Sequence, residues 1–126
     1  MIFFTPGEKA FQFWIKREWW DEAGMDKFKP STKYYPVLHG RPFKIVPLTQ
    51  IRPPERIVEG RGFKKDKMVP ILQAFKNFVP LKPVKVTENR EDKTDFPYEM
   101  HDGYHRFFAS VAVGFEEIAI VMVGDL

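Results

Sequence analysis

The 126-residue chain contains no cysteine, and this absence excludes several classes of chemistry at once. Without cysteine there are no disulfides, no thiolate zinc sites, no redox pairs and no thiol nucleophiles. Long apolar runs are also missing, and no stretch approaches the roughly 20 apolar residues that a membrane helix needs. The start of the chain, Met1-Ile2-Phe3-Phe4, lacks the basic beginning and long apolar segment of a signal peptide. We therefore expect a cytoplasmic protein with no membrane segment.

Composition and charge are those of an ordinary globular domain. Hydrophobic residues make up 44% of the chain and charged residues 29%, and the length suits one domain with its own core. The net charge of +3 is too small to diagnose nucleic-acid binding by itself. The positive charge is clustered, however, because the stretch from Arg41 to Lys67 holds eight lysines or arginines and three acidic residues. We interpret this basic stretch as either a solvated loop or a surface for the phosphates of a nucleic acid.

The first forty residues are rich in aromatic side chains. Thr5-Pro6-Gly7-Glu8 has the spacing of a capping box and Gly24 is a natural stop, which together predict a helix from about residue 6 to 23. Helical spacing predicts one buried face made of Phe11, Trp14, Ile15 and Trp19. It also predicts a second aromatic line made of Phe13 and Trp20. The second line either is covered by residues 25–42 or meets another molecule. We therefore expect residues 1–42 to form a helical extension packed on the core, with a protein partner or self-association as the alternative use of its second face.

From Phe43 onward, short β segments alternate with amphipathic helices. The pattern predicts strands at 43–48, 81–86, 98–101 and 117–123, a helix from Asp66 to before Pro80, and a helix over 104–113. Pro47 confines the first strand to an edge or ends it, while Asp66 and Gly114 are expected to begin and end helices. Residues 43–126 are therefore predicted to form an α+β domain in which helices flank a small mixed sheet.

The strand-turn-helix from Tyr98 to Gly114 carries most of the chemistry. Gly103 permits a tight turn, and the N–H groups and dipole of the first helical turn favour an anion there. His105 and Arg106 lie in that turn, where a cation needs a compensating anion or carboxylate. A phosphate suits both, since Arg106 can bind it through its planar fork and His105 through a hydrogen bond or a proton. Asp102 could cap the helix, orient His105 or hold magnesium.

Each of these residues also has a purely structural explanation. Asp102 is most simply an N-cap, and His105 alone could be an ordinary surface histidine. Arg106 alone could form an ion pair with one of three carboxylates, Glu99, Glu116 or Glu117. His101 lies four residues before His105, but the pair straddles the turn and shares no helix face, so we predict no metal site here.

The turn resembles the signature of the ParB/sulfiredoxin superfamily. Gly103-Tyr104-His105-Arg106 is similar to the Gly-Cys-His-Arg signature of sulfiredoxin and takes the place of Gly-Glu-Arg-Arg in ParB proteins. The continuation Phe107-Phe108-Ala109 also matches, and residues 46–53, 79–86 and 114–123 resemble three strand segments of the family in the same order. The resemblance implies a phosphate site for ATP, ADP or CTP, with or without magnesium. It carries over Gly103, Tyr104, His105 and Arg106 as binding residues, and Lys82 as a further contact.

The departures from the family limit what the resemblance implies. Tyr104 stands where sulfiredoxin has its reactive cysteine, so the repair of oxidised peroxiredoxin is not expected, and it also stands where ParB has glutamate. No helix-turn-helix follows residue 123, so centromere binding of the ParB type is not expected. The Asp-Gly-x-His-Arg form of the turn is closer to that of free-serine kinases. Three functions stay open: a nucleotide-dependent phosphotransferase or NTPase with Asp102 and His105 as catalytic groups, a nucleic-acid-binding or nuclease-like module, and a protein-interaction scaffold. A kinase would need a general base, for which Glu55, Glu59 and Glu88 are available.

Overall fold

Within residues 1–7, 10–33, 42–54, 62–89 and 96–125, which the computed structural model describes, the chain forms two sheets and three α-helices. In chain order, the elements are β1 (Ile2–Phe4), β2 (Gln12–Trp14), α1 (Arg17–Glu22), β3 (Lys44–Pro47), β4 (Ile51–Arg52), α2 (Lys65–Asn77), β5 (Val84–Glu88), β6 (Tyr98–Asp102), α3 (Tyr104–Val113) and β7 (Glu117–Met122). Two 3₁₀ turns, Leu48–Gln50 and Val123–Asp125, complete them. None of the helices in these residues is long and apolar enough to cross a membrane.

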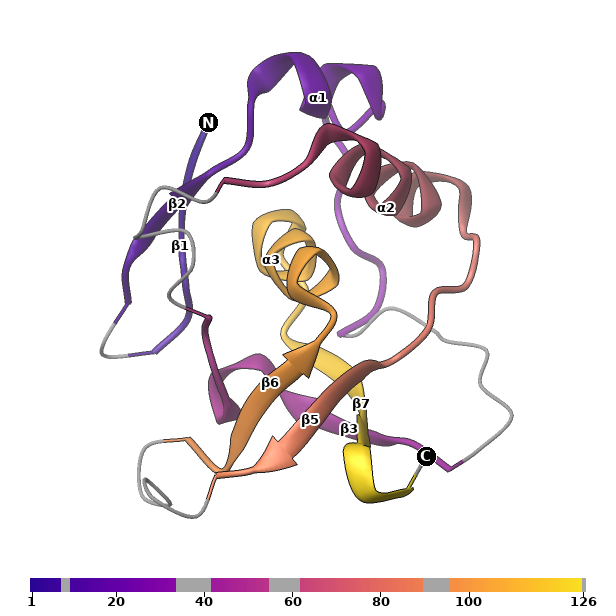
Figure 1. Cartoon of the computed structure of the whole chain (residues 1–126). Coiled ribbons are helices and arrows are strands. Elements are labelled where there is room, and N and C mark those ends of the chain that lie inside the picture. The colour runs from indigo at the N-terminus through magenta and orange to yellow at the C-terminus, as the bar shows by residue number, and fades with distance from the viewer. Residues whose placement is uncertain (8–9, 34–41, 55–61, 90–95, 126) are drawn as a thin grey trace.

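The larger sheet is mixed, with its five strands in the order β3-β7-β5-β6-β4. The pairs β3/β7 and β5/β6 are antiparallel, whereas β5/β7 and β4/β6 are parallel. Figure 1 shows α3 lying between this sheet and the pair formed by α1 and α2, with the hairpin β1–β2 beside it. The α+β architecture with a small mixed sheet and flanking helices is therefore confirmed.

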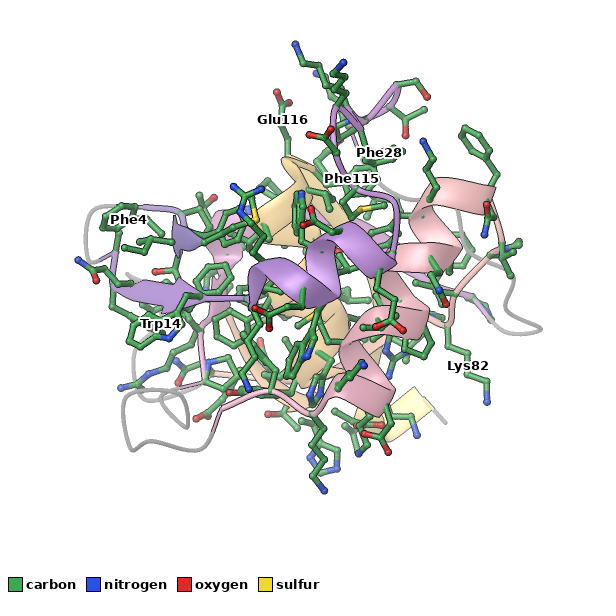
Figure 2. All side chains as sticks on the ribbon, turned by 90° about the horizontal axis from the view of Figure 1, so that it is seen from above. Phe4, Trp14, Phe28, Lys82, Phe115 and Glu116 are labelled. Atoms are coloured by element: carbon green, nitrogen blue, oxygen red, sulfur yellow. The ribbon has the colours of Figure 1, made fainter. Side chains whose placement is uncertain are left out.

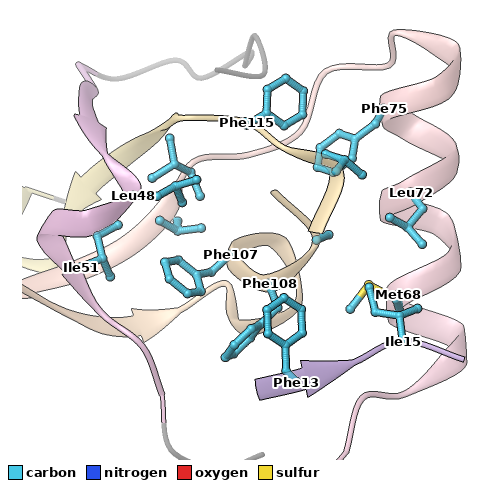
Figure 3. Packing of buried hydrophobic residues seen from close by; sticks show 14 of the residues in the cluster. Phe13, Ile15, Leu48, Ile51, Met68, Leu72, Phe75, Phe107, Phe108 and Phe115 are labelled. Carbon is cyan, nitrogen blue, oxygen red and sulfur yellow. The ribbon is translucent and has the colours of Figure 1, made fainter. Parts of the chain in front are cut away.

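The core lies where α3 meets the other layers. Phe107 and Phe108 on α3 are fully buried, and the ring of Phe108 meets that of Phe13 edge-on at 4.9 Å between centroids. On α2, the buried side chains recur at helical spacing toward α3: Met68, Leu72 and Phe75. Figure 3 shows these groups packed around the same centre, with Ile15 closing the side next to the hairpin. One continuous core therefore joins the N-terminal residues to the sheet domain.

Most elements predicted for residues 43–126 are present. The helix over 104–113 has the predicted bounds and ends at Gly114, which has a φ of 99°, and β3 is an edge strand as Pro47 indicates. The short strand β4 was missed, because two residues are too few for a periodic pattern. The predicted cap at Asp66 is wrong, since α2 begins one residue earlier with Lys64 at its N-cap and Asp66 in its first turn.

The predicted helix over residues 6–23 is wrong over its first half, where the chain forms the hairpin β1–β2; only α1 is helical. Thr5 does not cap a helix, because its hydroxyl accepts a 2.9 Å hydrogen bond from the N–H of Phe11 and so closes the hairpin loop. Side chains consequently alternate with a period of two, so that Phe13 and Ile15 are buried and Trp14 is exposed. The expected roles of the two aromatic lines are therefore reversed for Phe13 and Trp14.

One face of the hairpin is apolar and points to solvent. Ile2, Phe4 and Trp14 are each at least 60% exposed, and Ile2 lies opposite Trp14 in the strand register. Figure 2 shows Phe4 and Trp14 projecting away from the body of the molecule. The exposed apolar side chains thus lie on a strand face, whereas Trp20, which was assigned to the second aromatic line, is buried beneath the hairpin.

Candidate functional site

The turn between β6 and α3 is shaped by a glycine. Gly103 has a φ of 108° and lies so close to β5 that a Cβ atom there would approach Val84 Cγ1 to 2.6 Å. Only glycine fits this conformation and this contact. The register of β5 against β6 also shifts between Lys85 and Val86, directly beside Asp102, so the sheet is irregular where the turn begins. These two features fix the direction in which α3 starts.

The start of α2 meets the start of α3. The backbone N–H of Lys64, the N-cap of α2, donates a 3.0 Å hydrogen bond to Nε2 of His105 in the first turn of α3. In a capping box, the side chain at the third position of the helix accepts the N–H of the N-cap residue. Here His105 accepts that N–H for α2, although 41 residues separate Lys64 from His105 in sequence. The N-termini of both helices consequently face one pocket.

This pocket has a volume of about 370 Å³ and is contributed by both helices. Its lining consists of Gly62, Lys64, Lys67 and Ile71 from the α2 side and Asp102, Gly103, Tyr104, His105 and Arg106 from the α3 side. Among these described residues, three carry basic side chains, Lys64, Lys67 and Arg106, and one, Asp102, carries a carboxylate. The positive ends of two helix dipoles add to the cations, so the pocket electrostatically favours an anion.

Arg106 is held in place by contacts within the protein. Its Nη1 donates to the carbonyl oxygens of Lys82 at 2.7 Å and Pro83 at 2.9 Å, and its Nη2 lies 3.8 Å from Oδ2 of Asp102. Burial lowers the pKa of Arg106 from its ordinary value because it disfavours the charged form, and the nearby Asp102 partly offsets this. Among the described carboxylates, Asp102 therefore lies next to Arg106 in place of the alternative partners Glu99, Glu116 and Glu117, and the arginine braces the segment before β5.

Asp102 does not cap α3, because Gly103 is the N-cap and no side chain caps it. Oδ1 of Asp102 instead accepts a 2.9 Å hydrogen bond from the N–H of Gly103, while Oδ2 faces Arg106. The carboxylate side chain is still 61% exposed, so it stabilises the turn and remains in contact with the pocket. Within the described part of the chain, no three His, Asp or Glu side chains are grouped to hold a metal ion.

Tyr104 and His105 form the aromatic wall of the pocket. The Tyr104 ring lies 5.1 Å from that of Phe108 and 5.4 Å from that of Phe63, which precedes α2. The imidazole of His105 lies 5.5 Å from the same Phe63 ring. Tyr104 therefore anchors the first turn of α3 to the core, in the position where the resemblance places the reactive residue of the family.

The other predicted residues are placed differently. The carbonyl of Lys82 binds Arg106, but its side chain is exposed, does not line the pocket and in Figure 2 points outward at the edge of the molecule. Glu88 lies opposite Tyr98, at the far end of β6 from Asp102, so the hypothesis that it is a general base at this site is wrong. Glu55 and Glu59, and much of the basic stretch from Arg41, lie outside the described residues.

Lys64 and Lys67 were not singled out from the sequence. The signal for them was weak but present, because they are three residues apart at a helix start and belong to the basic stretch that ends at Lys67. What the sequence did not indicate is that α2 begins opposite α3, which depends on long-range packing between the two helices.

Comparison with known proteins bears on the fold. Neither protein-family models nor curated protein sequences match this chain. Among solved structures, the chain is similar to sulfiredoxin from Arabidopsis thaliana, with a TM-score of 0.51 and 22% sequence identity over 65% of this chain and 84% of that chain. A likeness at this identity concerns the fold alone. The chain therefore has a ParB/sulfiredoxin-like fold, as the resemblance of its strand and turn segments predicts.

Proposed function

We propose that the pocket between the N-termini of α2 and α3 binds the phosphates of a nucleotide such as ATP, ADP or CTP. The observation that carries this proposal is the convergence of two helix N-termini and two lysines on one pocket. A volume of about 370 Å³ lies within the range of small-molecule sites, roughly 300 to 1,000 Å³. The fold also supports phosphate binding, since it contains the turn in which the resemblance places the phosphate ligands.

The roles of the individual groups follow from their positions. The first turn of α3 lines the pocket through Gly103, Tyr104 and His105, so the positive end of this helix dipole faces the place proposed for the phosphates. Lys64 and Lys67 supply mobile positive charge from the opposite wall. Arg106 contributes through its charge and its Nη2 side, because its Nη1 is bound to the carbonyls of Lys82 and Pro83.

Magnesium fits this site only as a companion of the nucleotide. Asp102 is the single carboxylate among the lining residues that the structure describes, and one of its oxygens already accepts the N–H of Gly103. Mg²⁺ is commonly held by one or two carboxylates together with substrate phosphates and waters, and Asp102 can supply one such contact. When bound, the ion would neutralise part of the phosphate charge.

Transfer or hydrolysis of the terminal phosphoryl group is the reaction that we propose for such a site. It requires charge stabilisation on the phosphate oxygens, which Lys64, Lys67 and the two helix N-termini would provide. Asp102 would accept a proton from a nucleophile, and His105 would act on the phosphate as a hydrogen-bond donor.

A thermal-shift series with matched lysine variants tests the binding proposal. ATP, ADP, CTP and GTP, each with and without magnesium, are added to the wild type, to Lys67→Gln and to Lys76→Gln. Both variants remove one exposed positive charge from α2, but only Lys67 lines the pocket. At a nucleotide concentration of 100 times Kd, bound ligand stabilises by about 2.7 kcal/mol, so the melting temperature of the wild type and of Lys76→Gln should rise by several degrees. The proposal fails if no nucleotide raises it, or if Lys67→Gln and Lys76→Gln respond equally.

A nucleic-acid backbone is the second candidate ligand, because Lys64, Lys65 and Lys67 are all exposed at the start of α2. Lys65 pairs at 3.2 Å with Glu22 on α1, which leaves Lys64 and Lys67 directed at the pocket. Binding of a labelled single-stranded oligonucleotide that weakens steeply between 50 and 200 mM salt would support this candidate. Its absence at low salt would remove it.

A further inference from the structure

Given the proposed nucleotide function, we propose that the Lys64–His105 hydrogen bond is exchanged when an anionic phosphate enters the pocket, and that His105 takes up a proton in the exchange. In the structure, Nε2 of His105 accepts the backbone N–H of Lys64. In the bound protein, both the Lys64 N–H and the newly protonated Nε2 donate to phosphate oxygens. Binding therefore becomes linked to pH.

The exchange follows from the chemistry of the accepting nitrogen. An imidazole nitrogen accepts a hydrogen bond through the same lone pair that binds a proton, so Nε2 cannot be protonated and also accept the N–H of Lys64. The proton comes from solvent, the N–H···N hydrogen bond breaks, and two N–H···O hydrogen bonds to the anion replace it. No covalent bond forms or breaks apart from the N–H bond at Nε2.

The charges around His105 set the direction of this exchange. Lys64 and Lys67 face the pocket from α2, and Asp102, Tyr104 and Arg106 face it from the β6–α3 turn, with Lys82 beyond Arg106. The hydrogen bond from the Lys64 N–H requires Nε2 of His105 to be unprotonated, and the described lining residues place three basic side chains and one carboxylate near it. A phosphate group carrying two or more negative charges favours the imidazolium.

The Lys64–His105 hydrogen bond and the hydrogen bonds to the anion that replace it both couple α2 to α3. With the imidazole neutral, His105 closes the N-terminus of α2 against α3, and the rings of Phe63 and Tyr104 hold the imidazole from two sides. An N–H group that is freed from His105 becomes a ligand donor on the α2 side of the pocket. The anion thus replaces a contact between the two helices and keeps them joined.

Calorimetry with ATP in two buffers of different ionisation enthalpy, PIPES and Tris, measures the number of protons taken up on binding. The matched variant is His105→Gln, because a glutamine oxygen can accept the N–H of Lys64 but cannot take up a proton. Subtracting the variant from the wild type removes the protons that ATP itself exchanges. We expect the wild type to take up more protons than His105→Gln, by up to about one per ATP. The wild type should also bind ATP more tightly than the variant, and the ratio of the two affinities should fall by up to about tenfold for each pH unit above the titration of the imidazole.

A second measurement needs no ligand. In protein labelled with ¹⁵N-lysine, the amide resonance of Lys64 should shift as the pH is lowered from about 8 to 5 in the wild type and stay constant in His105→Gln. ATP binding with equal proton uptake in the two proteins, or a Lys64 resonance that ignores pH in the wild type, would overturn the exchange while leaving the nucleotide site standing. No ATP binding heat in either protein would overturn both proposals.

Discussion

Arg106 gives the sharpest prediction, because the structure assigns its guanidinium to the protein itself. Two hydrogen bonds run from Nη1 to the carbonyl oxygens of Lys82 and Pro83, at 2.7 and 2.9 Å, and the side chain is only 20% exposed. Hydrogen bonds to a charged group contribute about 1.5 to 3 kcal/mol each, and part of that is lost to the burial that lowers the pKa of Arg106. We therefore expect Arg106→Ala to lower the free energy of unfolding by about 2 to 4 kcal/mol.

Two further variants separate the contributions. Arg106→Lys keeps the charge but can reach one carbonyl at a time, so about 1 to 2 kcal/mol should be lost. Asp102→Asn removes a charge 3.8 Å from Arg106 on a side chain that is 61% exposed, so its effect on that ion pair should stay below about 1 kcal/mol. Lys82→Ala is the control, since it leaves the Lys82 carbonyl in place.

Urea unfolding followed by tryptophan fluorescence is a suitable assay, because Trp20 is buried beneath the hairpin and should report on the folded core. The order of stability should be wild type and Lys82→Ala, then Arg106→Lys, then Arg106→Ala. If Arg106→Ala unfolds at the urea concentration of the wild type, the bracing role is refuted and the guanidinium is available entirely to a ligand.

Four other substitutions test the turn, the hairpin and the end of α2. Gly103→Ala should lower the free energy of unfolding by about 2 to 4 kcal/mol, because it adds a Cβ 2.6 Å from Val84 Cγ1 at a φ of 108°; chemical denaturation measures this, and a neutral result would contradict the geometry. Phe13→Ala should cost about 3 to 5 kcal/mol and Trp14→Ala less than about 1, and the reverse order in thermal melts would favour a helix here. Phe78→Gly should raise the melting temperature by a few degrees, since Phe78 has a φ of 59° and is 75% exposed; a fall would mean that its ring contributes contacts.

The parts of the fold that could be predicted are those fixed by nearby residues. Gly103 and Gly114 flank the ten apolar-rich residues of α3, so the limits of this helix follow from the sequence alone. The hairpin could not be predicted, because Thr5 has the spacing of a capping box and also suits a loop closure, and Phe11, Phe13 and Ile15 fit a period of two as well as a helix.

The candidate site also has a part that could be predicted from the sequence and a part that could not. Residues 102–106 are consecutive, so their joint position at the start of α3 could be predicted from the turn they form. The contribution of α2 could not, because the hydrogen bond from Lys64 to His105 spans 41 residues and depends on how the two helices pack. Lys82 was placed by resemblance alone, and in this chain its carbonyl rather than its side chain meets the site.

Amide chemical-shift mapping with ATP tests the central claim most directly, since that claim is that the N-termini of α2 and α3 together bind the phosphates of a nucleotide. Titration of ¹⁵N-labelled protein should shift the amide resonances of Gly103–Arg106 and those of residues 62–67 together, with the same apparent Kd. The resonances of Phe78 and Val79, at the other end of α2, should stay unchanged and serve as an internal control. Shifts confined to one of the two helix starts, or located away from both, would contradict the account.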